Sequence, residues 1–111
     1  MSYQHENLAA GRWQEFNFFE QMANVGSEVE RTISWRQRNP EYSRLAFERA
    51  LELLDLTAAD KKNLSRLKEL LRVREALADY FMFDNIYGSD DQKWRNYFYA
   101  FNFAARNKVK S

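Results

Sequence analysis

Residues 39–56 read Asn-Pro-Glu-Tyr-Ser-Arg-Leu-Ala-Phe-Glu-Arg-Ala-Leu-Glu-Leu-Leu-Asp-Leu, and this stretch decides the fold class. Pro40 disfavours helical geometry at Asn39 and suits the first position of a helix, so we expect Asn39 to be the N-cap. The apolar residues that follow recur at helical spacing on one side: Leu45, Ala46, Ala50, Leu53 and Leu54, with Phe47, Leu51 and Leu56 widening the arc. Such a wide apolar arc predicts a helix that contacts more than one neighbour.

A long helix is also predicted upstream, beginning between Leu8 and Trp13 and ending before Pro40. Its apolar seam alternates spacings of three and four residues: Phe19, Met22, Gly26, Val29 and Ile33. Gly inside a helix costs about 1 kcal/mol relative to Ala. We therefore expect another helix to approach closely at Gly26, with a kink or a break there as the alternative.

Downstream, the segment Thr57-Ala58-Ala59-Asp60 resembles a capping box and predicts a third helix that runs to about Phe83. The predicted seam of this helix is Leu64, Leu67, Leu71, Ala78 and Phe81, with Leu70, Leu77 and Tyr80 alongside. Arg74 lies on the same seam, so its charge must reach solvent or find a partner.

Residues 84–91 read as a connection with Gly88 as a turn residue, and Ser89-Asp90-Asp91-Gln92 is a capping box for a fourth helix. One face of this helix carries Trp94, Phe98, Phe101 and Ala105, and Tyr97, Tyr99 and Phe103 fall on other faces. The fourth helix is thus predicted to be aromatic nearly all round.

The whole chain, residues 1–111, is predicted to be one domain: an all-α four-helix bundle of the antiparallel up-and-down type. Three Gly and one Pro leave few turns, which favours long helices over a β fold. A hydrophobic share of 45% is typical of a globular chain. We expect residues 1–8 to be flexible and residues 107–111 to form a basic tail.

The absence of cysteine excludes a disulfide framework, a zinc ribbon and thiol chemistry. Residues 1–8 lack the apolar core of a signal peptide, and no apolar run approaches the roughly 18 residues that span a bilayer. We therefore expect a cytoplasmic protein that has no membrane contact.

No catalytic or metal-binding constellation is recognisable, so we predict a protein that is not an enzyme and uses no cofactor. His5 is the only histidine, which excludes a Glu-x-x-His metal site and the familiar nucleophile–histidine triads. The three glycines stand alone and form no phosphate-binding loop. Glu48, Glu52 and Asp55 share a stripe that could bind a hard cation, and pairing with arginine is the alternative.

Nucleic-acid binding is one of two functional hypotheses. Its candidate basic patch is Lys61, Lys62, Arg66, Lys68 and Arg72, and arginine recurs beside aromatic residues elsewhere in the chain. The net charge of only +1 provides no overall field toward nucleic acid. Neighbouring acidic helices could instead pair with these cations.

Association with a second copy or another protein is the leading hypothesis. Three Trp, six Tyr and nine Phe are more aromatic residues than one stripe per helix buries. The candidate aromatic interface is Trp94, Tyr97, Tyr99 and Phe103, and a homodimer is the simplest outcome. The alternative is an irregular bundle that buries these side chains itself.

Polar residues within the predicted seams are the remaining candidates for a specific site. They are Glu28 and Arg31 on the first helix and Arg74, Glu75 and Asp79 on the third. A buried ion-pair network that only fixes the register of the helices is the alternative.

Several segments carry a resemblance to other proteins: residues 28–36, 49–57, 72–75, 79–81, 97–98 and 104–106. Their order resembles a group of small, uncharacterised prokaryotic all-helical proteins, a likeness that implies no activity. The chain also resembles HEPN-type helical bundles, some of which cleave RNA or partner small nucleotidyltransferases. The nucleolytic members carry an Arg followed by His; Arg95, the nearest counterpart here, has no His after it. The likeness therefore implies at most a non-catalytic partner role.

Overall fold

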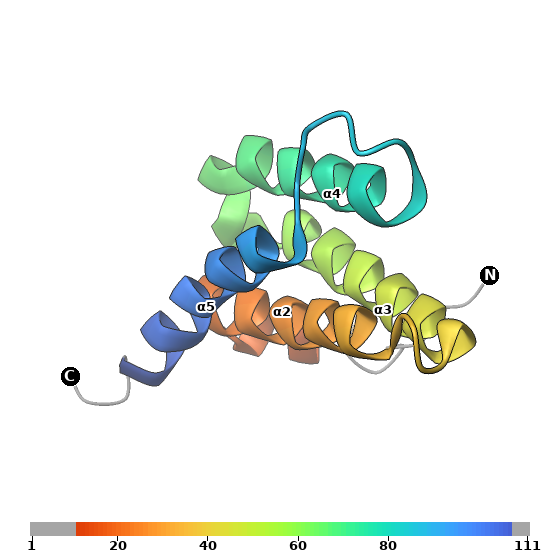
Figure 1. Cartoon of the computed structure of the whole chain (residues 1–111). Coiled ribbons are helices and arrows are strands. Elements are labelled where there is room, and N and C mark those ends of the chain that lie inside the picture. The colour runs from red at the N-terminus through yellow and green to blue at the C-terminus, as the bar shows by residue number, and fades with distance from the viewer. Residues whose placement is uncertain (1–10, 108–111) are drawn as a thin grey trace.

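The computed structural model describes residues 11–107 and confirms an all-α four-helix bundle (Figure 1). The helices are α2 (Phe18–Trp35), α3 (Pro40–Ala59), α4 (Leu67–Met82) and α5 (Asp91–Asn107). Two 3-10 turns, η1 (Arg12–Glu15) and η2 (Lys61–Arg66), precede α2 and α4. The predicted flexible segment 1–8, with His5, and residues 108–111 of the predicted basic tail lie outside the described residues.

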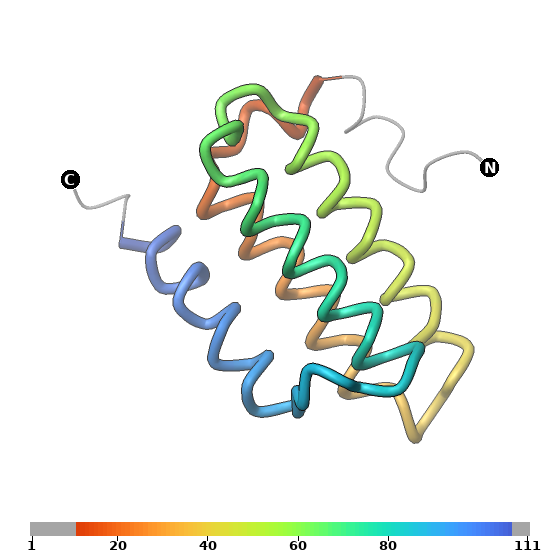
Figure 2. Tube along the Cα trace, turned by 90° about the horizontal axis from the view of Figure 1, so that it is seen from above, coloured from red at the N-terminus to blue at the C-terminus, as the bar shows by residue number. Residues whose placement is uncertain are grey.

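Helix α2 is the central element, since it packs along both α3 and α5, whereas α4 lies mainly against α3 and η2. Contacts between α2 and α5 run in opposite order: Gly26 meets Phe98 near the middle of α5, whereas Arg36, just after α2, meets Asp91 at its start. Figure 2 shows the chain reversing direction from each helix to the next.

The start of α2 corrects the expected first helix, which was predicted to begin between Leu8 and Trp13. Asn17 accepts a hydrogen bond from the Glu20 amide, and the Glu20 carboxylate accepts one from the Asn17 amide. This reciprocal capping box fixes the first helical residue at Phe18. Trp13 lies upstream in η1 and is nevertheless buried, so it belongs to the core without belonging to the helix.

Gly26 is the point of closest approach between α2 and α5. A Cβ atom built at this position would lie 2.7 Å from the Cβ of Phe98, closer than carbon atoms can pack. Helix α2 continues through Gly26 without interruption. The expected close approach of another helix is therefore confirmed, and the alternative of a break is not.

The end of α3 corrects a second expectation. Asn39 caps α3 and Pro40 is its first residue, as predicted. Thr57, however, starts no new helix: it is buried within α3, and its hydroxyl donates to the Leu53 carbonyl at 2.7 Å. Asp60 instead caps η2 by accepting a hydrogen bond from the Lys62 amide.

The core face of α4 also differs from the predicted seam. Leu70, Val73 and Leu77 are the apolar residues that α4 buries, whereas Leu71 of the predicted seam is 54% exposed. Leu64 lies in η2 and is 73% exposed. The 3-10 geometry of η2 turns the chain more per residue than an α-helix does, so Leu64 and α4 do not share one continuous helical phase.

Helix α5 begins one residue later than its predicted cap implies. Asp90, not Ser89, accepts the hydrogen bond from the Lys93 amide at 2.8 Å. Trp94 and Phe98 are buried as predicted for the core face of this helix. Phe101 is half-buried and packs edge-on against Phe18 of α2.

Candidate interaction surface

Glu28 and Arg31, predicted as a polar pair in the first seam, form an ion pair that extends to α3. Glu28 is buried, and its carboxylate accepts from Arg31 at 2.9 Å and from Arg49 of α3 at 3.3 Å. Both arginines remain partly exposed. A buried carboxylate held between two cations ties α2 to α3, and this arrangement fits the register-fixing alternative.

Arg74, Glu75 and Asp79 do not form one network. Arg74 donates to Asp55 of α3 at 2.8 Å, so its guanidinium points away from the α4 seam and pairs with α3. Asp79 is buried and accepts from the amides of Ile86 and Tyr87 at 2.9 and 3.1 Å. Asp79 therefore anchors the connection between α4 and α5.

Glu75 is the member of this set that stays on the surface. Its negative charge lies close to the Tyr87 hydroxyl and raises the pKa of Tyr87 above its ordinary value. Glu75 and Tyr87 thus belong to the same surface region, which the 83–87 loop shares with α4.

A buried polar network that sequence reasoning missed closes one end of the bundle. Gln21 donates to Asp60 at 2.9 Å and to the Trp13 carbonyl at 3.0 Å. Asn63 donates to the Gln21 side-chain oxygen at 2.8 Å, and the Trp13 indole donates to the Thr57 hydroxyl at 3.0 Å. The only sequence signal for this network is a polar residue, Gln21, beside an apolar seam.

The charge within this network is neutralised at its edge. Burial opposes ionisation of Asp60, but hydrogen bonds from Lys62 and Gln21 outweigh it and lower the pKa of Asp60. Lys62 also donates to the Gln14 carbonyl at 2.9 Å. The polar groups of this network satisfy one another's hydrogen bonds, so a structural role at this end of the bundle accounts for them.

A second polar cluster joins three helices at the opposite end. Asp91, the first residue of α5, accepts from Arg36 at 2.7 Å and from the Tyr80 hydroxyl at 2.6 Å. Burial opposes ionisation of Asp91, but these two hydrogen bonds lower its pKa overall. A carboxylate at a helix N-terminus is also favoured by the helix dipole.

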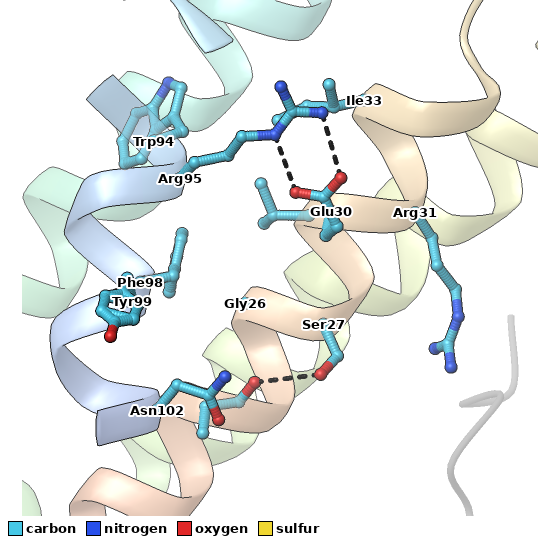
Figure 3. A pocket seen from close by; sticks show the side chains of 12 residues that line it. Gly26, Ser27, Glu30, Arg31, Ile33, Trp94, Arg95, Phe98, Tyr99 and Asn102 are labelled. Carbon is cyan, nitrogen blue, oxygen red and sulfur yellow. Dashed lines mark hydrogen bonds and ion pairs between the residues drawn. The ribbon is translucent and has the colours of Figure 1, made fainter. Parts of the chain in front are cut away.

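A hollow of about 410 Å³ lies between α2 and α5, and Figure 3 shows its lining. Arg95 spans its upper edge with a two-pronged ion pair to Glu30, at 2.9 and 3.0 Å. Hydrogen bonds from Arg95 lower the pKa of Glu30. The buried Trp94 indole nitrogen has no hydrogen-bond partner among the described residues, and no measurable surface of that atom opens to the hollow.

The predicted basic patch is partly committed to contacts within the chain. Lys62 is bound to Asp60, and the Arg66 guanidinium lies 4.3 Å from the ring centre of Phe18. Lys61, Lys68 and Arg72 are exposed. The structure therefore leaves three of the five proposed cations on the surface without a recorded ion pair in residues 11–107.

The predicted aromatic interface is divided by the structure. Trp94 is 7% exposed and belongs to the core, which corrects its place in that interface. Tyr97 is half-buried and donates to Glu69 at 2.9 Å; burial, followed by this carboxylate, raises the pKa of Tyr97. Tyr99 and Phe103 are the two members on the surface, at 56% and 54% exposure.

Another set of exposed apolar side chains lies on α4 and the connection that follows it. Leu71 is 54% exposed, Phe83 70%, Ile86 78% and Tyr87 55%. These four line a hollow of about 470 Å³ together with Ala78. We call the surface formed by Leu67, Leu71, Ala78, Phe83, Ile86 and Tyr87 the α4–loop face.

Polar groups border this face without filling it. Arg74 and Glu75 line the hollow, and Asp79 holds the backbone of the loop in place beside it. The face therefore combines an apolar floor, a charged edge and a loop fixed by buried hydrogen bonds. These are features of protein contact surfaces.

Metal and membrane sites find no support in the described part of the chain. No group of three His, Asp or Glu side chains in residues 11–107 lies close enough to hold a metal ion. On the acidic stripe of α3, Glu48 pairs with Arg44 and Asp55 with Arg74. No helix among residues 11–107 is both long and apolar enough to cross a bilayer.

Comparison with known protein families, curated proteins and solved structures found no match for this chain.

Proposed function

We propose that this protein acts by associating with a second copy of itself through the α4–loop face. The observation that carries the proposal is the exposure of Leu71, Phe83, Ile86 and Tyr87 around one hollow. Contiguous exposed apolar surface of this kind marks contact sites on soluble proteins. Full burial of one leucine side chain stabilises a contact by about 1.5–3 kcal/mol.

The face is held in shape in the single chain, which lowers the entropy lost on association. Asp79 fixes the loop through the Ile86 and Tyr87 amides, and Asn85 exchanges two hydrogen bonds with the Ser89 backbone. Ile86 and Tyr87 are thus held at the surface by a structured loop.

Nucleic-acid binding has weaker support than association. Lys62 and Arg66 of the predicted patch are engaged with Asp60 and with the Phe18 ring. Phosphate binding requires exposed cations that can displace the counterions condensed on the nucleic acid. Three exposed cations remain, on a chain of net charge +1.

The test is the mass of the protein in solution. Sedimentation velocity at tens of micromolar should show a dimer for the native chain and a monomer for Leu71→Glu, because the added carboxylate would be buried in an apolar contact where Arg74 is already paired with Asp55. Tyr99→Glu is the matched control, since Tyr99 has similar exposure but lies on α5.

Circular dichroism should show that both variants keep the helical fold. A native chain that sediments as a monomer at this concentration would overturn the proposal. A dimer that is lost with Tyr99→Glu and kept with Leu71→Glu would move the contact to the exposed aromatic residues of α5.

A further inference from the structure

We infer that the element received by the α4–loop face is α4 of the second copy, in antiparallel orientation, with Lys68 of each copy opposite Glu75 of the other. This inference rests on the proposed self-association and specifies its geometry. The supporting observation is an apolar stripe of α4 outside the core, in which Leu71 is exposed and Leu67 and Ala78 are half-buried.

The uncovered stripe has the spacing of a helix–helix seam. Leu67, Leu71, Arg74 and Ala78 follow one another at intervals of four, three and four residues, and all four lie within α4. Alternating intervals of three and four place side chains along one line that a second helix can follow. The core face of α4 is the separate line Leu70, Val73 and Leu77, so this seam is not buried: Leu71 is exposed, and Leu67, Arg74 and Ala78 are half-buried.

Arg74 is compatible with this seam because its charge is already satisfied. Its guanidinium donates to Asp55 of the same chain at 2.8 Å. The aliphatic part of the side chain can then pack against a neighbour while the charged end stays at the edge.

A two-fold axis that crosses the middle of the seam pairs large side chains of one copy with small or slender side chains of the other. An interface built on such an axis is isologous: if a residue of the first copy contacts a given residue of the second, the same contact forms with the two copies exchanged. In the antiparallel arrangement Leu67 lies opposite Ala78 of the second copy, and Leu71 lies opposite the stem of Arg74. A large side chain thus meets a small or slender one at each level.

The same axis places opposite charges together at the edge. Lys68 and Glu75 are both exposed, and each follows a seam residue, Leu67 or Arg74, by one position. Reversing the direction of the second helix brings Lys68 of one copy beside Glu75 of the other, and the symmetry forms this pair twice. Charges that border a helix seam set the choice and orientation of the partner.

A parallel arrangement lacks this complementarity. Each seam residue would then lie at the level of the same residue in the second copy, which brings the two Arg74 side chains together. Two Arg74 stems then meet at one level and two Ala78 side chains at another, so large side chains no longer face small ones. Lys68 and Glu75 would remain at different levels and form no pair.

The experiment exchanges the two charges between separate variants. Lys68→Glu carries two acidic groups at the edge, and Glu75→Lys carries two basic groups. Each variant alone should dimerise roughly ten-fold more weakly than the native chain, since two exposed attractive pairs become two repulsive ones. An equimolar mixture should form a heterodimer, because the acidic edge of the Lys68→Glu chain then meets the basic edge of the Glu75→Lys chain.

Sedimentation equilibrium of each variant and of the mixture at low salt provides the measurement. Lys61→Glu and Glu15→Lys are the matched controls, because both positions are exposed and lie outside the α4–loop face. Neither control should weaken the dimer, and mixing them should change nothing. Added salt should reduce the difference between each charge variant and the native chain.

The results separate the two proposals. A native dimer whose strength is unchanged in both charge variants, or is not restored on mixing them, overturns the antiparallel pairing and leaves self-association standing. A native chain that is monomeric overturns both. Lys68→Gln and Glu75→Gln, which remove charge without reversing it, should show smaller losses in the same direction.

Discussion

At the scale of single residues, the missing side chain of Gly26 sets the distance between α2 and α5. The Phe98 side chain occupies the space that a Cβ atom would need. Glycine ordinarily destabilises a helix by about 1 kcal/mol relative to alanine, so the packing against Phe98 must outweigh that loss. This makes Gly26 a position where the usual effect of a Gly-to-Ala change is reversed.

Gly26→Ala is expected to lower the free energy of unfolding by about 1–3 kcal/mol, because the added methyl group forces α2 and α5 apart. Urea denaturation followed by circular dichroism measures the change. Ser27→Ala on the exposed side of the same turn is the control and should have little effect. A Gly26→Ala protein more stable than the native one would show that the helices separate easily.

The ionisation of Asp60 makes the stability of this end of the bundle depend on pH. Its pKa is lowered in the folded protein, so the ionised form stabilises the fold above the ordinary pKa of 3.8. That stabilisation is lost as the pH falls below this value toward the folded pKa.

Asp60→Asn should therefore reduce stability by about 1 kcal/mol at neutral pH, with the difference from the native chain shrinking below about pH 4. Thermal unfolding across that pH range checks the prediction. Asp84→Asn, at an exposed position in the connection before α5, should leave the native pH dependence unchanged. A difference that stays constant from neutral to acidic pH would remove the carboxylate charge as its cause.

At the scale of the helices, boundaries marked by proline were predictable and boundaries marked by Ser or Thr were not. Pro40 favours the first position of a helix, so Asn39 was assigned correctly as its cap. Thr57 and Ser89 each offered a hydroxyl that could cap a helix. Thr57 binds backward to the Leu53 carbonyl, and the cap of α5 moved to Asp90.

The two candidates at the start of α5 provide a direct comparison. Asp90→Ala should lower stability by about 1 kcal/mol, because the Lys93 amide loses its acceptor. Ser89→Ala should have little effect, since the recorded hydrogen bonds of Ser89 are made by its backbone. Chemical denaturation of the two variants side by side decides which residue is the cap.

The seam of α4 shows why the candidate surface could be recognised only in part. The sequence of α4 carries two apolar lines, and periodicity alone does not tell which one faces the bundle. The line through Leu71 was predicted to be core, but the structure buries Leu70, Val73 and Leu77. The apolar line through Leu71 was therefore detected correctly, but it was wrongly assigned to the core of the bundle.

The loop residues of the α4–loop face could not be predicted from any pattern in the sequence. Ile86 and Tyr87 join the α4–loop face only because Asp79 binds their amides. An acidic residue that follows a helical apolar line gives no signal of which backbone groups it will bind. The excess of aromatic residues led us to expect an interface on the fourth helix, where Tyr99 and Phe103 are exposed and Trp94 is in the core, whereas the α4–loop face lies on the third helix and the loop after it.

At the scale of the whole molecule, the four helices are unequally embedded. Helix α2 lies between α3 and α5, and α4 is an outer element that lies mainly against α3 and η2. Figure 1 shows α4 and the connection after it forming one side of the molecule. The same side carries the α4–loop face.

This unequal embedding has a consequence for the order in which the molecule opens. Elements with fewer buried contacts unfold locally at lower free energy than the rest of a domain. Native-state hydrogen exchange should therefore show α4 amides exchanging through a partial opening, while those of α2 exchange only when the whole domain unfolds.

Occupation of the α4–loop face would change that hierarchy. Amide protection in α4 should rise with protein concentration, while protection in α2 should change less. The Leu71→Glu variant should show no such dependence. The outermost helix would then be a cooperative unit whose folding is completed by the second chain.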